Sequence, residues 1–159
     1  MIREGTIKKM KRLCIIPCGA KKIWDKYPQE GPTEARHTYI SPFGKACQAY
    51  ASQFFENWVI LSAKHGFLFP TDIVKENYDL AFDSKSSEII SIESLQTQMK
   101  EKGLLEFDEV VLLAGKKHKK VVEKLYSKEK LVYPLEGCKG IGYMLQNLKH
   151  AINNQEEIQ

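Results

Sequence analysis

The sequence predicts a three-layer α/β/α sandwich around a four-stranded, mainly parallel sheet. Four short runs are apolar on consecutive residues rather than on alternate ones, which is typical of strands buried on both faces. Segments with helical spacing separate these runs, and this alternation favours right-handed crossovers with helices on both faces of the sheet. The predicted strands are Leu13 to Pro17, Trp58 to Ser62, Val110 to Ala114 and Leu131 to Pro134.

Four helices are predicted from apolar residues spaced three and four positions apart. Ser41 followed by Pro42 is typical of a helix N-terminus, because serine caps the first turn and proline fits its first position. The four apolar faces comprise Phe43, Ala46, Cys47, Tyr50 and Phe54; Ile89, Ile92, Leu95 and Met99; Val121, Val122 and Leu125; and Ile141, Leu145, Leu148 and Ile152.

We expect one α/β domain over residues 13–152, between a basic N-terminal segment (1–12) and a polar C-terminal tail (153–159). A chain of 159 residues with 43% hydrophobic residues suits one continuous core. Two long stretches, 19–40 and 66–85, fit no regular element, and each follows a predicted strand. Ligands bind over the carboxyl ends of the strands in an open α/β sheet, so we expect the functional site there.

Several classes of protein are excluded by composition and by the lengths of the apolar runs. With 28% charged residues beside its apolar runs, the sequence is neither disordered nor collagenous. Its apolar runs are far shorter than the roughly 20 residues that span a bilayer, so we expect no membrane partner. The apolar stretch after the N-terminal segment is too short for a signal peptide. We therefore expect a cytoplasmic protein, either a monomer or a homodimer.

The four cysteines do not have the paired spacing of a structural zinc site, so we expect no metal. Nothing in the sequence calls for a cofactor either. Cys14 and Cys47 fall on apolar faces and are expected to be core thiols. Cys18 and Cys138 lie at the ends of predicted strands, where a role as nucleophile or metal ligand stays open.

Positive charge is concentrated in two parts of the chain. Residues 1–26 carry a net charge of +6, and residues 116–120 hold four more lysines. If the fold brought the two clusters together, they could follow a phosphate backbone. Solvated surface lysines are an equally good interpretation.

The stretch after the first strand contains candidate anion-binding residues. Gly19 permits a sharp turn out of the sheet, and Lys21 could meet a phosphate near the strand end. Further along, Arg36 and Ser41 precede or cap a helix N-terminus, where backbone N–H groups favour an anion.

The second strand ends in Leu-Ser-Ala-Lys-His-Gly, which places Ser62, Lys64 and His65 at a predicted ligand-binding edge. Desolvation there would lower the pKa of the lysine or histidine toward the range useful for proton transfer. The alternative is a structural histidine beside a lysine that extends into water.

The second long stretch contains Asn77, Tyr78 and Asp79 in succession. A base could stack on Tyr78, and Asp79 could hydrogen-bond it or position a water molecule. Turn formation by Asn77 and Asp79 is the structural alternative.

Glycines follow the last two strands. Gly115 comes directly after the third strand, and Gly140 and Gly142 lie just before the last helix, where free backbone N–H groups could approach an anion. Glu136 lies in the same loop. The pattern is neither G-x-G-x-x-G after a first strand nor a Walker A motif.

These motifs together resemble a small bacterial and phage domain family of unknown function that is related to the YaaA-like proteins. The resemblance runs from about Leu13 to Lys149, and the Leu-Ser-Ala-Lys-His-Gly block is its most specific part. It implies a fold similar to the uracil-DNA glycosylase superfamily and an association with DNA. The motifs that carry it are Ile16 to Lys22, Arg36 to Pro42, Leu61 to Gly66, Tyr78-Asp79, Ala114-Gly115 and Gly140 to Gly142.

The sequence departs from the glycosylase pattern in two blocks. It has no Gly-Gln-Asp-Pro-Tyr-His after the first strand and no His-Pro-Ser-Pro after the last. A water-activating carboxylate would have to come from Asp79, Asp25 or Glu136.

The leading hypothesis is an enzyme that acts on a nucleobase or its N-glycosidic bond in nucleic acid, with DNA favoured over RNA. Asp79 would orient water or stabilise an oxocarbenium-like sugar, and His65 or Lys64 would donate to the departing base. Tyr78 or Tyr39 would stack the base. Phosphates would be held by Lys21, Arg36 and the turn from Gly140 to Gly142.

Two alternatives stay open. A non-catalytic DNA-binding protein of stress or protection would recognise a base in the same cleft and bind in a salt-dependent manner. An enzyme of free nucleotides or nucleosides would be saturated by a mononucleotide and have little affinity for duplex DNA.

Overall fold

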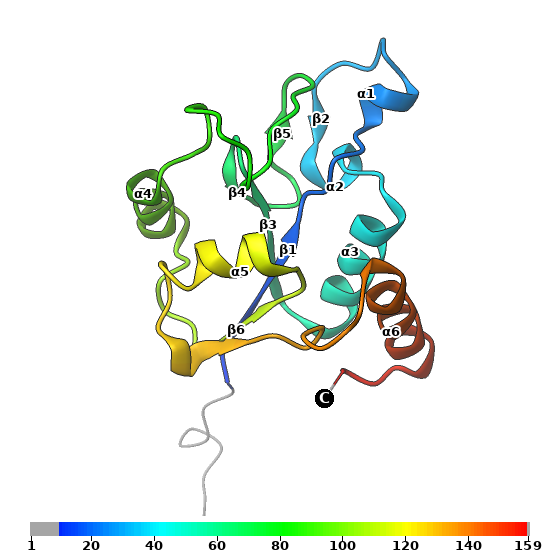
Figure 1. Cartoon of the computed structure of the whole chain (residues 1–159), viewed down its shortest axis with the longest axis vertical. Helices are drawn as coiled ribbons and strands as arrows, with labels where there is room; N and C mark the ends of the chain where they lie inside the picture. Colours follow the sequence, from blue (N-terminus) through cyan, green and yellow to red (C-terminus); the bar gives the residue numbers. More distant parts are fainter. Residues whose placement is uncertain (1–9, 159) are drawn as a thin grey trace, which may run out of the picture.

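The computed structural model describes residues 10–158 and has a mixed five-stranded sheet at its centre (Figure 1). The strand order is β4-β3-β1-β6-β7. All four predicted strands are present and mutually parallel where they pair. Their bounds, with that of the fifth strand, are β1 Arg12–Pro17, β3 Asn57–Ser62, β4 Gly66–Leu68, β6 Glu109–Leu112 and β7 Leu131–Val132.

The prediction of four strands is corrected by β4, which pairs antiparallel with β3. The chain turns back immediately after β3, and Gly66 adopts a φ of +73° in that turn. A Cβ at Gly66 would lie 2.2 Å from Oε1 of Gln98, so glycine is required here. Gln98 donates to the carbonyl of His65 and accepts from the N–H of Phe67, which holds the turn in place.

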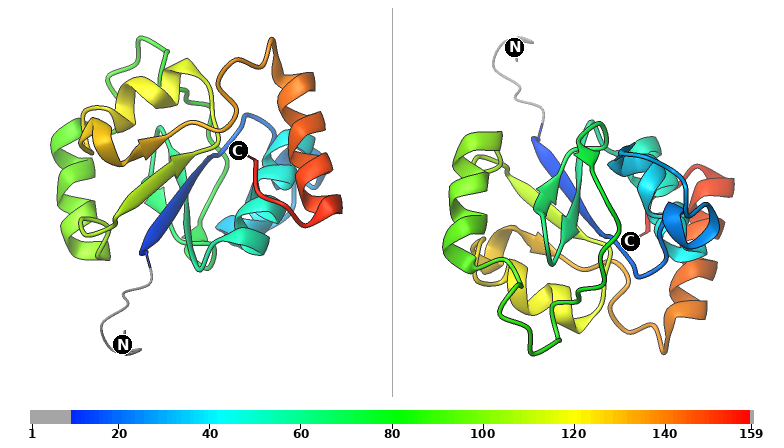
Figure 2. Two further views of the ribbon diagram at one scale, coloured as in Figure 1. Left: turned by 90° about the horizontal axis from the view of Figure 1, so that it is seen from below. Right: turned by 90° about the horizontal axis from the view of Figure 1, so that it is seen from above.

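Helices cover both faces of the sheet, so the three-layer arrangement is present (Figure 2). Alternate residues of β1 belong to two separate cores: Cys14 and Ile16 pack in one, Leu13 and Ile15 in the other. The first core lies under α3 (Pro42–Phe54) and α6 (Ile141–Asn154), and the second lies under α4 (Ile92–Lys102) and α5 (Lys116–Val122).

The start predicted from Ser41 and Pro42 is accurate, whereas the second predicted helix begins later than expected. Ser41 caps α3 and accepts a hydrogen bond from the N–H of Gly44 at 3.1 Å. Ser91 caps α4 in the same way, so the helix begins at Ile92 and leaves Ile89 outside it. The third helix, α5, ends at Val122, so Leu125 also lies outside.

The two stretches expected to be irregular contain short elements, which corrects that expectation. Strands β2 and β5 pair antiparallel above the carboxyl ends of the sheet (Figure 1). Elements of two to four residues have too few positions to show a period, so pattern analysis misses them. They are α1 Ile23–Lys26, β2 Thr33–Glu34, α2 Ala35–Thr38 and β5 Ile73–Val74, and a 3₁₀ turn, η2, spans Lys128–Lys130.

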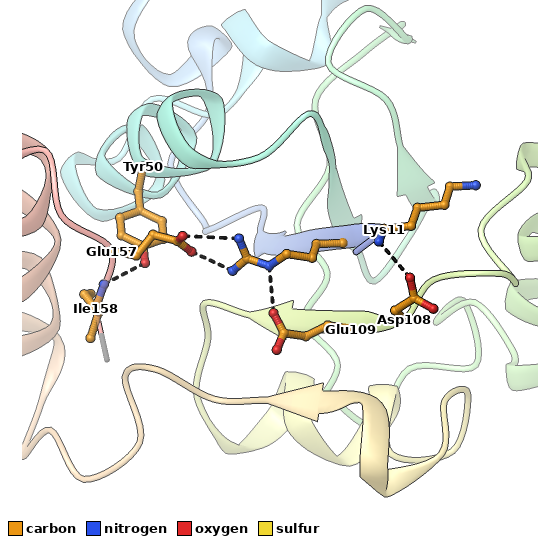
Figure 3. Close-up of polar contacts among 7 residues, drawn as sticks. Lys11, Tyr50, Asp108, Glu109, Glu157 and Ile158 are labelled. Carbon is orange, nitrogen blue, oxygen red and sulfur yellow. Dashed lines mark hydrogen bonds and ion pairs between the residues drawn. The ribbon is translucent and has the colours of Figure 1, made fainter. Parts of the chain in front are cut away.

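The start of β1 is tied to the C-terminal tail by an arginine with two carboxylate partners (Figure 3). Arg12 donates to Glu109 at 2.7 Å and to Glu157 at 2.6 and 3.2 Å, and these contacts raise the pKa of the guanidinium. The N–H of Ile158 donates to the hydroxyl of Tyr50. The tail is therefore packed on the domain. Residues 1–9 of the predicted basic segment lie outside the described residues.

No helix in the part of the chain that the structure describes is long and apolar enough to cross a membrane.

We expect Glu157→Gln to lower the free energy of unfolding by about 1–2 kcal/mol, because it removes a charge-assisted bidentate contact from Arg12. Urea denaturation measures this change. Glu156→Gln alters a neighbouring exposed carboxylate and is the matched control, expected to stay near wild type. Equal stabilities of the two variants would contradict a role for the ion pair.

Candidate functional site

A cavity with a volume of about 730 Å³ lies over the carboxyl ends of β1 and β6. We call it the strand-end pocket. Its walls come from the turn after β1, the segment from β6 into α5, the first residues of α3 and α6, and the loop 79–82. The lining residues include Cys18, Gly19, Lys21, Lys22, Ser41, Phe43, Asp79, Phe82, Gly115, Lys117, His118, Gly142 and Met144.

The strand-end pocket combines apolar walls with a few charges. Phe43, Phe82 and Met144 provide much of the apolar surface, and three lysines are opposed by a single carboxylate, Asp79. A shallower hollow of about 500 Å³ adjoins the pocket and shares Ala20 and Asp79 with it. Asp25, Asn77 and Tyr78 line that hollow. This arrangement suits an anionic ligand with an aromatic or apolar part.

Behind the hollow, the hydroxyl of Tyr78 is the centre of a buried polar network. It lies 2.7 Å from Oγ of Ser62 and 2.5 Å from the hydroxyl of Tyr39. Oγ of Ser62 also accepts the backbone N–H groups of Lys64 and His65. The network joins the end of β3, the loop around Tyr78 and the segment after α2, so it fixes the floor of the hollow.

Cations and an imidazole surround the ring of Tyr78. Nζ of Lys22 lies 4.3 Å from the ring centroid, and Nζ of Lys64 lies 5.7 Å from it. The His65 ring packs edge-on at 5.0 Å between centroids. Burial raises the pKa of Tyr78, with the nearby Cys18 thiol acting in the same direction, so its hydroxyl stays protonated at neutral pH. Burial has the opposite effect on the imidazole of His65 and lowers its pKa.

Cys18 lines the strand-end pocket, but burial raises the pKa of its thiol and Lys22 only partly opposes that effect. The thiolate needed for nucleophilic attack is therefore disfavoured. Cys14 and Cys47 are fully buried core thiols. Cys138 lies away from the pocket and accepts a hydrogen bond from the side chain of Asn147. Among the described residues there is no cluster of three metal-ligating side chains.

His118 is a pocket residue that the sequence analysis overlooked. It lies on α5 with 5% of its surface exposed, and its Nε2 has no hydrogen-bond partner. Its ring meets that of Phe82 edge-on at 5.3 Å. Burial, and secondarily Lys117, lowers its pKa from 6.5 to about 4, while a hydrogen bond with the backbone of Leu61 and the charge of Asp83 oppose the shift. The lysines on either side of His118 hid this residue from sequence analysis, because a run of lysines resembles a solvated helix face.

The structure brings most of the predicted site residues together at this edge of the sheet. Asp79 belongs to both cavities, whereas Tyr39 is only 1% exposed and Ser62 is fully buried, so both lie in the network behind the hollow. The remaining predicted residues in the strand-end pocket are Gly19, Lys21, Ser41, Gly115 and Gly142, and Asn77 and Tyr78 line the adjoining hollow.

Besides Tyr39 and Ser62, five predicted residues do not line either cavity. Arg36 is exposed and paired with Glu34 at 2.7 Å, and Glu136 pairs with Lys119 at 3.2 Å. Lys64 and His65 lie beside the ring of Tyr78, and their backbone N–H groups donate to Ser62 in the polar network. Gly140 precedes α6 without reaching the pocket wall. A role for these five residues in substrate binding or catalysis stays a prediction.

Comparison with known proteins identifies the family. A family of unknown function, DUF6884, matches residues 13–150. The chain belongs to this family. An uncharacterized protein, YfjM, from Bacillus subtilis (strain 168) is 49% identical over 150 residues, which cover 94% of this chain and all of that protein. No solved structure matches. The likeness to YaaA-like proteins and to the uracil-DNA glycosylase fold stays a prediction.

Replacement of Tyr78 by phenylalanine tests the buried network. We expect Tyr78→Phe to lower the free energy of unfolding by about 1–3 kcal/mol, because the buried hydroxyl of Tyr39 loses its partner. Chemical denaturation measures this change. Tyr143 is 60% exposed, so Tyr143→Phe is the control and is expected to change the free energy of unfolding little. A similar loss in both variants would contradict the importance of the network.

The buried imidazole predicts a pH dependence of stability. Because folding lowers the pKa of His118, its stabilising effect is complete above about pH 6.5 and is lost as the pH falls toward 4. Between about pH 7 and pH 4.5, wild type should lose about 2 kcal/mol more than His118→Leu. Denaturation curves across this range measure the difference. Parallel pH profiles would contradict the buried neutral state.

Proposed function

We propose that the protein is an enzyme that holds a nucleoside unit in the strand-end pocket and acts on its base or its N-glycosidic bond. The observation that carries this proposal is the position of Asp79, which shares one pocket with the aromatic rings of Phe43 and Phe82 and with three lysines. The pocket volume falls within the roughly 300–1,000 Å³ of small-molecule sites. Aromatic walls suit a base, and the lysines suit phosphate oxygens.

Asp79 is the carboxylate on which the chemistry depends in this proposal. Asp79 lines both the pocket and the adjoining hollow, so its carboxylate can orient a water molecule or stabilise positive charge on the sugar. Protonation of the departing base falls to a second group. Lys21 and Lys117 line the pocket, so they are better placed for this role than Lys64 or His65.

A second candidate function is action on a free nucleotide or nucleoside. It is favoured because cations of the two predicted basic clusters form ion pairs within the fold. Arg12 is occupied by Glu109 and Glu157, and Lys119 pairs with Glu136. These two cations are therefore paired within the fold, which reduces the charge available for a long phosphate backbone.

The test is mass spectrometry of small molecules released from DNA, RNA and mononucleotides that carry normal and modified bases. We expect a free base to be released, and Asp79→Asn to slow the release by at least about 100-fold, since it removes the carboxylate charge at constant volume. Release from polymers supports action on nucleic acid, and release from mononucleotides alone supports the second candidate.

Glu101→Gln is the matched control for this experiment. Glu101 lies exposed on α4, remote from the pocket, and its loss changes the net charge as Asp79→Asn does. The control should retain full activity. Absence of both base release and a mass change of the base in every substrate, or equal activity of Asp79→Asn and wild type, would overturn the proposed function.

A further inference from the structure

A lysine ammonium is buried at the strand-end pocket without an anionic partner. Lys22 follows β1, and only 3% of its surface is exposed. Nζ donates to the carbonyl of Ala20 at 3.0 Å and lies 4.3 Å from the centroid of the Tyr78 ring. Among residues 10–158, no carboxylate forms an ion pair with it. An ammonium has three donors, so two donors and the charge itself are left for another group.

The backbone of Lys22 is held firmly, so this position is built into the fold. Its N–H donates to the carboxylate of Asp25 at 2.8 Å, and the residue forms a β-bridge with Tyr39. The N–H of Ile40 donates to the carbonyl of Lys21 next to it. Burial of a charge costs free energy unless the charge is paired, and nothing in the local backbone requires a lysine here. Its position in a pocket wall points to a ligand.

The surroundings of Lys22 also favour an anion. Lys21 and Lys117 line the same pocket, against the single carboxylate of Asp79. The 13-residue helix α3 begins at the pocket with Ser41 and Pro42, so the positive end of its dipole faces the same space. Aromatic side chains complete the wall. A ligand that carries one phosphate beside an apolar ring would satisfy both parts of the pocket.

We propose that Lys22 binds a phosphate group of the substrate, which makes the substrate a nucleotide rather than a free base or a nucleoside. This inference rests on the proposed function for the nucleoside part of the ligand, whereas the phosphate contact stands on Lys22 alone. A phosphate monoester of a mononucleotide and a phosphodiester of nucleic acid share the required oxygens. The experiment separates these two sources.

Calorimetric titration with inorganic phosphate, nucleoside 5′-monophosphates, the matching nucleosides and a short single-stranded oligonucleotide tests the proposal. We expect phosphate and nucleotides to bind wild type, and nucleosides to bind more weakly than their monophosphates. Lys22→Met keeps the length of the side chain and removes its charge, and it should weaken phosphate and nucleotide binding by about 10- to 100-fold. Tighter binding of the oligonucleotide than of the mononucleotides would assign the phosphate to nucleic acid.

Lys45→Met is the matched control, because Lys45 is exposed on α3 outside the pocket and its loss changes the net charge equally. It should bind as wild type does at matched ionic strength in chloride. Denaturation of Lys22→Met without ligand shows whether it folds, and removal of an unpaired buried charge should not destabilise it. If that variant fails to fold, phosphate must still raise the melting temperature of wild type.

Three results would overturn the inference. They are equal phosphate affinity in Lys22→Met and wild type, an equal loss of affinity in Lys45→Met, and no phosphate-dependent stabilisation of wild type. The base-release assay is independent of these readouts. Phosphate binding through Lys22 without base release would contradict the proposed chemistry but support the phosphate site. Base release that is unaffected by Lys22→Met would support the chemistry but contradict the phosphate site.

Discussion

The site depends on the pairing of β1 with two parallel neighbours. Because β1 lies between β3 and β6 with both partners in the same direction, the three chains leave the sheet at one edge. Its register places Ile15 opposite both Val59 and Leu112, which fixes how far each strand extends. Three groups of pocket residues come directly from these strand ends: residues 17–22 from β1, Ala63 from β3, and residues within 114–118 from β6.

The loops above that edge are ordered by polar contacts rather than by long elements. The hydroxyl of Tyr78 links the loop 77–82 to Ser62 at the end of β3 and to Tyr39 after α2. Each hydroxyl in the network lies where little water reaches it, so each depends on the others for a hydrogen-bond partner. Asp79 is the next residue along the chain, and its position at the junction of the two cavities therefore follows from the anchoring of Tyr78.

Much of the architecture could be predicted from the sequence, because β1, β3 and β6 are continuous apolar runs and Ser41 with Pro42 marks a helix start. Strand β4 escaped prediction, since its three residues show no period and its turn depends on contacts of Gln98 from a distant helix. The edge of the sheet that holds the strand-end pocket was predictable from topology. Burial of individual side chains was not, and Lys21 and Lys22 illustrate this: adjacent lysines look alike in a sequence, yet one is exposed and the other is enclosed.

Two departures from ordinary packing meet in the same cavity. Lys22 is an enclosed ammonium without a carboxylate partner among the described residues, and Nε2 of His118 is a buried imidazole nitrogen without a hydrogen bond. Either feature alone would be a modest cost in a marginally stable domain. The two come from different strand ends and have no shared structural cause, yet both line the strand-end pocket. A folded chain tolerates such local conflicts where they serve a ligand, because that ligand supplies the missing partners.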